Sequence, residues 1–219
     1  MAIRNPHQRV GVFVDVQNLY YSARNIYNSR INFNAVLEAA VGDRQLIRAI
    51  AYCIRADMPE EHTFFDALDK AGFEVKIKDL QTYYGGYQKG DWDVGIAVDA
   101  IKTLNKLDVV VLCCGDGDFI PLVEYLKISG QLVEVCAFGK STSGKLKELA
   151  DNFIDFDQNP KKFLMPIKPK SAGFRIFSRD EKHDDKHEDK RDDKDRSGAG
   201  GQRGNDRGAA GSGSGKHEH

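Results

Sequence analysis

The chain has 219 residues, a formal net charge of −1 and a hydrophobic fraction of 41%, which allows one packed domain with an appendage. No apolar run approaches the roughly 18 residues of a membrane helix, and no apolar leader precedes the first predicted strand. These features exclude a membrane-spanning segment and predict a soluble, cytoplasmic protein.

Apolar runs alternate with helix-like stretches from the N-terminus to about residue 157. The apolar runs predict strands at residues 9–16, 44–54, 73–80, 107–114 and 131–138, with a short edge strand at 153–157. The stretches between them predict helices at residues 17–30, 33–40, 59–72, 91–107, 118–130 and 140–153. Strands that alternate with helices form right-handed crossovers, so the expected fold class is a three-layer α/β domain with a mostly parallel central sheet.

The four cysteines, Cys53, Cys113, Cys114 and Cys136, all lie in apolar runs, and no pair has metal-ligand spacing. Neighbouring residues of a strand point to opposite faces, so a disulfide between Cys113 and Cys114 is not expected. All four are predicted to be buried thiols in a reducing, intracellular setting.

The composition changes sharply towards the C-terminus. Residues 182–196 repeat a tetrad of the type KHDD, and the stretch that follows is rich in Gly and Ser. Such sequences bury too little apolar surface to offset the entropy of ordering. We therefore expect a domain at residues 8–158, a linker at 159–172 and a disordered, low-complexity tail at 173–219. The role of the tail stays open between a loose contact with RNA or protein and a solubilising segment.

Acidic residues follow two of the predicted strands. Asp15 ends the first strand, and Asp116 and Asp118 lie just past the fourth, in the run CCGDGDF. Reactive crevices of open α/β sheets lie at the carboxyl ends of the strands, so these carboxylates converge if the two strands are neighbours. Clustered carboxylates suit hard cations such as Mg²⁺ or Mn²⁺. Each aspartate taken singly is equally well explained as a strand-end cap or a turn residue.

Two acids of the helix before the fourth strand extend this set. Asp93 lies at the helix start, where an acid is also a common partner of the helix dipole, and Asp99 lies in an apolar stretch. Six residues turn a helix by about 600°, so the two side chains are about 120° apart and border one cleft without stacking. Asn18, about one helical turn after Asp15, is placed to orient an acid or a metal-bound water, or is an ordinary first-turn residue.

Four segments taken together resemble the NYN domain family, specifically its bacterial LabA-like branch, within the PIN-like nuclease superfamily. They are VGVFVDVQNLYYSAR, KGDWDVGIAVDAI, VVVLCCGDGDFIPLVEYLKISGQLVEVCAF and LKELADNFIDF, in this order. The Asp-x-x-Asn of the first strand, the acidic helix start and the GDGDF strand end are specific as a set. Cys114 stands where the family often has Ser.

The resemblance implies a PIN-like α/β/α domain and a metal-dependent ribonuclease, an endonuclease-type phosphodiesterase that uses a metal-activated water. Transferred to this chain, it assigns catalysis to Asp15, Asn18, Asp93 and Asp116. It assigns metal binding to Asp15, Asp93, Asp99, Asp116 and Asp118. The implied cofactor is Mg²⁺ or Mn²⁺, and the implied partner is single-stranded RNA, with no membrane contact. A homodimer is left open.

Two polar segments are candidates for substrate contacts. The loop QTYYGGYQKG carries Tyr84 and Lys89, a ring that can stack on an unpaired base and a cation for phosphate. The second segment lies near the start of the last predicted helix, where hydroxyl groups and positive charges can bind a phosphate of the substrate. Its residues are Lys140, Ser141, Thr142 and Lys145. The ordinary alternatives are a loop packed on the domain by its tyrosines and a plain surface helix start.

Other interpretations fit the residues less well. Residues 139–145 nearly spell a P-loop, but Leu146 replaces the Ser or Thr that should bind Mg²⁺. The competing hypothesis is a non-catalytic RNA-binding or regulatory interaction protein with the same fold, because fold alone does not establish activity.

Overall fold

A six-stranded parallel sheet forms the centre of the computed structural model, which describes residues 4–55, 61–82 and 88–167. In spatial order its strands are β4 (Glu74–Asp79), β3 (Gln45–Arg55), β1 (Arg9–Asp15), β7 (Val109–Cys113), β8 (Leu132–Ala137) and β9 (Asn152–Asp155). All neighbouring pairs of this sheet are parallel. The predicted sheet is therefore confirmed, and β9 is an edge strand as expected.

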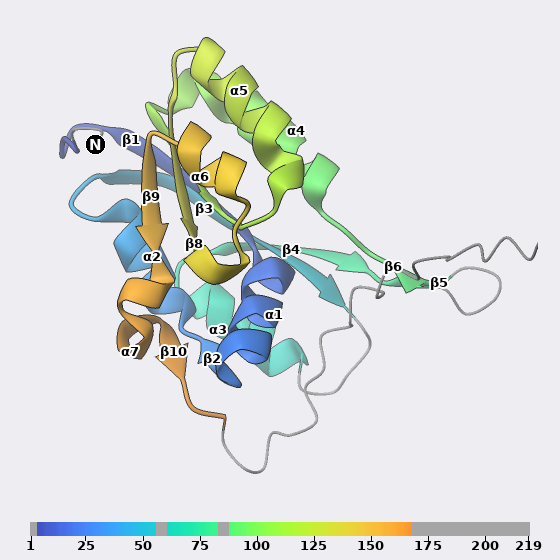
Figure 1. The fold of residues 1–219 in the computed structure, drawn as a ribbon. Helices are drawn as coiled ribbons and strands as arrows, with labels where there is room; N and C mark the ends of the chain where they lie inside the picture. Colours follow the sequence, from blue (N-terminus) through green and yellow to red (C-terminus); the bar gives the residue numbers. More distant parts are fainter. Residues whose placement is uncertain (1–3, 56–60, 83–87, 168–219) are drawn as a thin grey trace, which may run out of the picture. The chain divides into compact units, whose positions relative to one another are not determined.

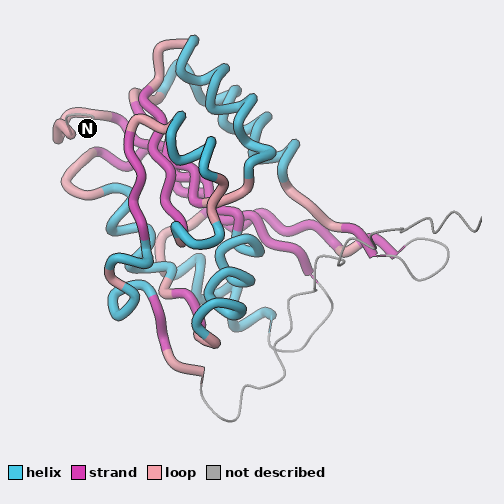
Figure 2. Tube along the Cα trace, in the orientation of Figure 1, coloured by secondary structure: helices cyan, strands magenta, loops and turns pink. Residues whose placement is uncertain are grey.

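Helices cover both faces of the sheet (Figure 1). One face packs against α1 (Val16–Tyr27), α2 (Phe33–Val41) and α3 (Glu61–Lys70), and the other against α4 (Asp93–Thr103), α5 (Ile120–Ile128) and α6 (Gly144–Leu149). Short 3₁₀ turns are η1 (Leu104–Lys106), η2 (Gly117–Phe119), η3 (Gly139–Ser141) and η4 (Phe156–Gln158). Figure 2 shows helices on both sides of the magenta strands, which confirms the three-layer α/β/α fold. Among the described residues, no helix has the length and apolarity to cross a membrane.

Side-chain alternation along the strands sorts the apolar residues into two cores. In β7, Val111 faces the core below α1, α2 and α3, whereas Leu112 faces the core below α4, α5 and α6. The same alternation sends Cys113 and Cys114 to opposite cores. All four cysteines are free and buried, so the prediction of buried thiols without a disulfide is confirmed.

Two short strand pairs lie outside the central sheet. The strands β5 (Gln81–Thr82) and β6 (Gln88–Lys89) pair antiparallel at the two ends of the loop that the sequence predicted before α4. The strands β2 (Arg30–Ile31) and β10 (Leu164–Met165) also pair antiparallel. Two-residue strands carry no readable alternation, so the sequence pattern did not predict them.

The first residues of the predicted linker at 159–172 carry secondary structure. They form α7 (Pro160–Phe163) and β10. Phe163 is only 4% exposed, and its ring centroid lies 4.3 Å from that of Phe156. Removing these rings from water holds residues 160–165 against the domain. The predicted tail lies outside the described residues.

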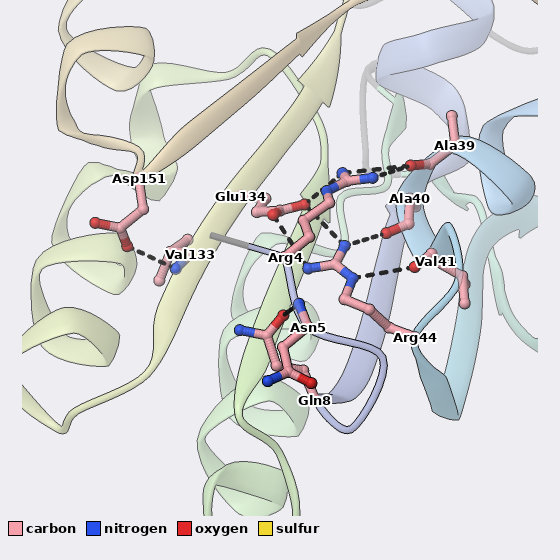
Figure 3. Close-up of polar contacts among 10 residues, drawn as sticks. All are labelled: Arg4, Asn5, Gln8, Ala39, Ala40, Val41, Arg44, Val133, Glu134 and Asp151. Carbon is pink, nitrogen blue, oxygen red and sulfur yellow. Dashed lines mark hydrogen bonds and ion pairs between the residues drawn. The ribbon is translucent and has the colours of Figure 1, made fainter. Parts of the chain in front are cut away.

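A buried ion network joins α2 to β8 (Figure 3). The Glu134 carboxylate accepts from Arg44 Nη1 at 3.1 Å and from Arg44 Nη2 at 2.9 Å. Arg44 also donates to the carbonyl oxygens of Ala40 and Val41, at 2.6 and 3.0 Å, where α2 ends. Arg4 Nη2 lies 2.9 Å from the same Glu134 carboxylate. The N-terminal segment, α2 and β8 are thus held by one buried acid.

Candidate functional site

The carboxyl ends of β1 and β7 lie side by side. The two strands are neighbours in the sheet, with Val14 opposite Cys113. Asp15 is the last residue of β1 and caps α1, since its Oδ1 accepts from the Asn18 backbone N–H at 3.0 Å. The adjacency of the two acid-bearing strands, on which the predicted convergence depended, is confirmed. The capping role considered for Asp15 is also confirmed.

Asn18 and the segment before α6 fasten the turn that follows β7. The Gly115 N–H donates to Asn18 Oδ1 at 2.9 Å, and the Gly115 carbonyl accepts from the Ser143 N–H at 3.0 Å. A Cβ on Gly115 would lie 2.8 Å from Thr142 Oγ1 and 3.1 Å from Thr142 Cα. Glycine is therefore required here because the neighbouring backbone approaches more closely than a side chain permits.

Asp116 and Asp118 lie on this turn. Asp116 is the N-cap of η2, and its Oδ1 accepts from the Asp118 N–H at 3.1 Å. Asp116 is partly buried, whereas Asp118 is exposed. The turn role weighed from the sequence is thus confirmed for Asp116, and it determines where this carboxylate lies.

Cys114 lies between the two strand ends and is 2% exposed. Its Sγ is 3.7 Å from Asp15 Oδ2 and accepts from the Asp116 N–H at 3.4 Å. The pKa of the Cys114 thiol is raised well above its ordinary value, first by burial and then by the negative charge of Asp15. The hydrogen bond from the Asp116 N–H lowers this pKa by a smaller amount, and the charges of Asp116 and Asp93 add smaller increases. The Asp15 carboxylate and the Asp116 backbone therefore both contact one buried thiol.

The donor chemistry of these acids suits a hard cation. Over residues 4–55, 61–82 and 88–167, no three His, Cys, Asp or Glu side chains are arranged so that they could hold a metal ion together. Mg²⁺ commonly takes only one or two carboxylates and completes its shell with waters and phosphate oxygens. Asp15 and Asp116 lie close together at these strand ends, because the Asp15 carboxylate and the Asp116 backbone N–H both contact Cys114.

Asp99 has a different set of partners. Its Oδ2 accepts from Lys76 Nζ at 2.6 Å and from the Tyr52 hydroxyl at 2.9 Å. Burial alone would raise the pKa of Asp99, but the hydrogen bonds from Lys76 and Tyr52 outweigh burial and lower it. Asp99 thus has a lysine of β4 as its counter-ion.

The sequence of this chain also matches known proteins. The model of the NYN domain family matches residues 9–157. The chain belongs to the NYN domain family. It is 25% identical over 158 residues to the Low amplitude and bright protein LabA of Synechococcus elongatus, and the match covers 68% of this chain and 84% of LabA. The fold also matches the crystal structure of a protein of unknown function from Vibrio parahaemolyticus, with a TM-score of 0.67 and 36% sequence identity. This match covers 75% of this chain and 100% of that chain. The LabA-like resemblance and the PIN-like nuclease superfamily are confirmed.

In this NYN domain, the side chains of the two candidate substrate-binding residues of the loop before α4 cannot be placed from the described residues. Tyr84 lies outside the described residues, and Lys89 ends β6 with a side chain that is not described. Thr142 is 8% exposed, and its hydroxyl donates to the Phe138 carbonyl at 2.7 Å. Thr142 therefore stabilises the backbone segment that packs against Gly115, in the turn that carries Asp116 and Asp118.

The other candidates of this segment lie on the surface, near α1. Lys140 Nζ lies 3.2 Å from the Tyr27 hydroxyl and 5.0 Å from the centre of that ring. Ser141 Oγ lies 2.9 Å from Ser22 Oγ. Lys145, in the first turn of α6, is exposed. Lys140 and Ser141 therefore lie in η3 and contact α1. They precede the residues that pack on the turn carrying Asp116 and Asp118.

Trp92 is a site residue that the sequence patterns did not single out. Its Nε1 donates to the Cys53 carbonyl at 2.8 Å. Lys78 Nζ lies 5.9 Å from the centre of the Trp92 ring and donates to the Asp91 carbonyl at 3.1 Å. These contacts hold the start of α4 on β3 and β4, and so they position Asp93. The signal in the sequence was the chain's single tryptophan, directly before Asp93.

Proposed function

We propose that this NYN domain protein is a metal-dependent ribonuclease that hydrolyses phosphodiester bonds of single-stranded RNA. The observation that carries the proposal is that Asp15 and Asp116, at the ends of neighbouring parallel strands, both contact the buried side chain of Cys114. Like charges gathered in one place cost stability unless a cation neutralises them. The carboxyl ends of the strands are also where α/β folds bind ligands.

Asp15 and Asp116 would hold Mg²⁺ or Mn²⁺, with Asp93 beside them and the exposed Asp118 reaching the ion through water. When bound, the cation supplies an activated water and stabilises the negative charge that develops on the phosphate. Asp99 is left out of this set because its carboxylate is paired with Lys76.

The remaining groups of the site hold these oxygens in place. Asp15 uses Oδ1 to cap α1 and Oδ2 to contact Cys114, so both oxygens are oriented before any ligand binds. Asn18 uses Oδ1 to hold Gly115, which leaves its Nδ2 to donate to a phosphate or a water. Donors and acceptors fixed in advance need not reorganise when charge develops during the reaction.

The RNA would run over the surface beside the acidic turn. Lys140 and Lys145 offer cations there, and Ser141 offers a hydroxyl. Tyr84 and Lys89, from the loop before α4, would supply a ring for an unpaired base and a cation for its phosphate. Single-stranded RNA suits such contacts because its bases are free to stack on aromatic side chains.

The test is to incubate the full chain with end-labelled linear RNA and with circular RNA, in Mg²⁺, Mn²⁺ or EDTA. We expect cleavage with a cation and none with EDTA, and cleavage of the circle identifies endonuclease action because a circle has no ends. Asp15→Asn and Asp116→Asn should each abolish cleavage. The matched control is Asp108→Asn, before β7, where the carboxylate pairs with Arg9 at 2.8 Å.

Two results would contradict this proposal. RNA that is bound but not cut with either cation would make the domain a non-catalytic RNA-binding protein. Cleavage that survives Asp116→Asn unchanged would assign the activity to other groups or to a contaminating nuclease.

A further inference from the structure

The side chain of Cys114 contacts both acid-bearing segments of the proposed metal centre. Its thiol lies 3.7 Å from Asp15 Oδ2 and accepts from the Asp116 N–H at 3.4 Å. The residue is 2% exposed, so water does not compete for these contacts. Because Cys114 contacts the carboxylate of Asp15 and the backbone of Asp116, it helps to fix the relative position of these two acids.

We propose that Cys114 is a positioning residue of the metal centre, its side chain holding Asp15 and Asp116 in the arrangement that takes the cation. The role rests on the proposed function, because it requires that these two acids bind the metal. Cys114 acts through the carboxylate and the backbone, not as a ligand. Partners of this kind, one shell behind the ligands, orient the ligands and tune metal affinity.

The neighbouring thiol provides a matched control. Cys113 is 0% exposed and faces the opposite core, where it neighbours Cys136. Truncation of Cys113 removes the same atoms from an equally buried place, but on the side of the sheet away from Cys114. A change confined to Cys114 variants therefore reports the contacts with the acids and not the general cost of a small cavity.

The polar role of Cys114 is separated from its volume by comparing two variants. Cys114→Ser and Cys114→Ala leave side chains of nearly equal size, but serine keeps a donor and an acceptor, and alanine keeps neither. Mn²⁺ binding to the full chain is measured from the electron paramagnetic resonance signal of the free ion. We expect Cys114→Ala to weaken Mn²⁺ affinity about tenfold, and Cys114→Ser to stay within about threefold of the parent.

Cys113→Ala should bind Mn²⁺ as the parent does, and urea unfolding should show that all variants are folded. The role of Cys114 is overturned if Cys114→Ala binds as tightly as the parent, or if Ser and Ala weaken binding equally, which would mean packing alone. A parent that binds no Mn²⁺ overturns the metal centre itself together with this role. Normal parent binding with an unaffected Ala variant overturns only the role of Cys114.

Discussion

Replacement of Glu134 by alanine tests the buried ion network between α2 and β8. The side chains of Arg44 and Glu134 are 1% and 2% exposed. Removing one partner of a buried pair leaves the other charged and unsolvated, which costs about 3–5 kcal/mol. Arg44 keeps its bonds to the carbonyls of Ala40 and Val41, so we expect a loss near the lower end of that range. At roughly 2–4 °C per kcal/mol for a domain of this size, Tm should fall by about 6–12 °C.

The loss is measured by urea and thermal unfolding, followed by the fluorescence of Trp92, the single tryptophan of the chain. Its indole N–H is bonded to the Cys53 carbonyl at 2.8 Å, so its emission reports the folded sheet. Arg4→Ala is the control, because the Arg4 side chain is 32% exposed and its loss should cost about 1 kcal/mol or less. A Glu134→Ala loss as small as that of Arg4→Ala would refute the reasoning, since Arg44 would then be solvated without its partner.

Asp93→Asn should abolish cation-dependent cleavage, whereas Asp99→Asn should retain it, because Asp99 faces a lysine; equal loss in both variants would return Asp99 to the metal set. The stability advantage of the parent over Asp99→Asn should be complete at pH 7 and shrink as pH falls below about 4, because hydrogen bonds outweigh burial and hold the pKa of Asp99 below its ordinary value. Urea midpoints of both proteins at pH 7 and pH 3 check this, and a constant difference would contradict it. Gly115→Ala puts a Cβ 2.8 Å from Thr142 Oγ1 and 3.1 Å from Thr142 Cα, so it should cost about 1–3 kcal/mol in urea unfolding. Gly144→Ala, with nothing within 4 Å of the added Cβ, is its control, and equal unfolding free energies for the two variants would rule out the close approach.

The order of the main strands and helices was predictable because each element carries its own local signal. A strand buried on both faces is apolar along its buried length, as residues 10–14 of β1 and the whole of β7 are, and this pattern can be recognised without knowledge of any partner. The acids at the ends of these strands were visible for the same reason, since Asp15 and Asp116 interrupt apolar runs. The helix α7 and the strand β10 carry no such signal, and the burial of Phe163 against Phe156 decided their place.

The sequence by itself determined the fold class, the family and which carboxylates stand at strand ends. Only the tertiary structure decided their partners, because partners depend on strand order and register. Asp99 pairs with Lys76, 23 positions away on β4, and α4 therefore turns this acid towards a lysine. Cys114 touches Asp15, 99 positions away, because β7 lies beside β1 with their carboxyl ends level. No local pattern encodes such a contact, since it arises where two segments distant in sequence are brought into register by hydrogen bonds of the sheet.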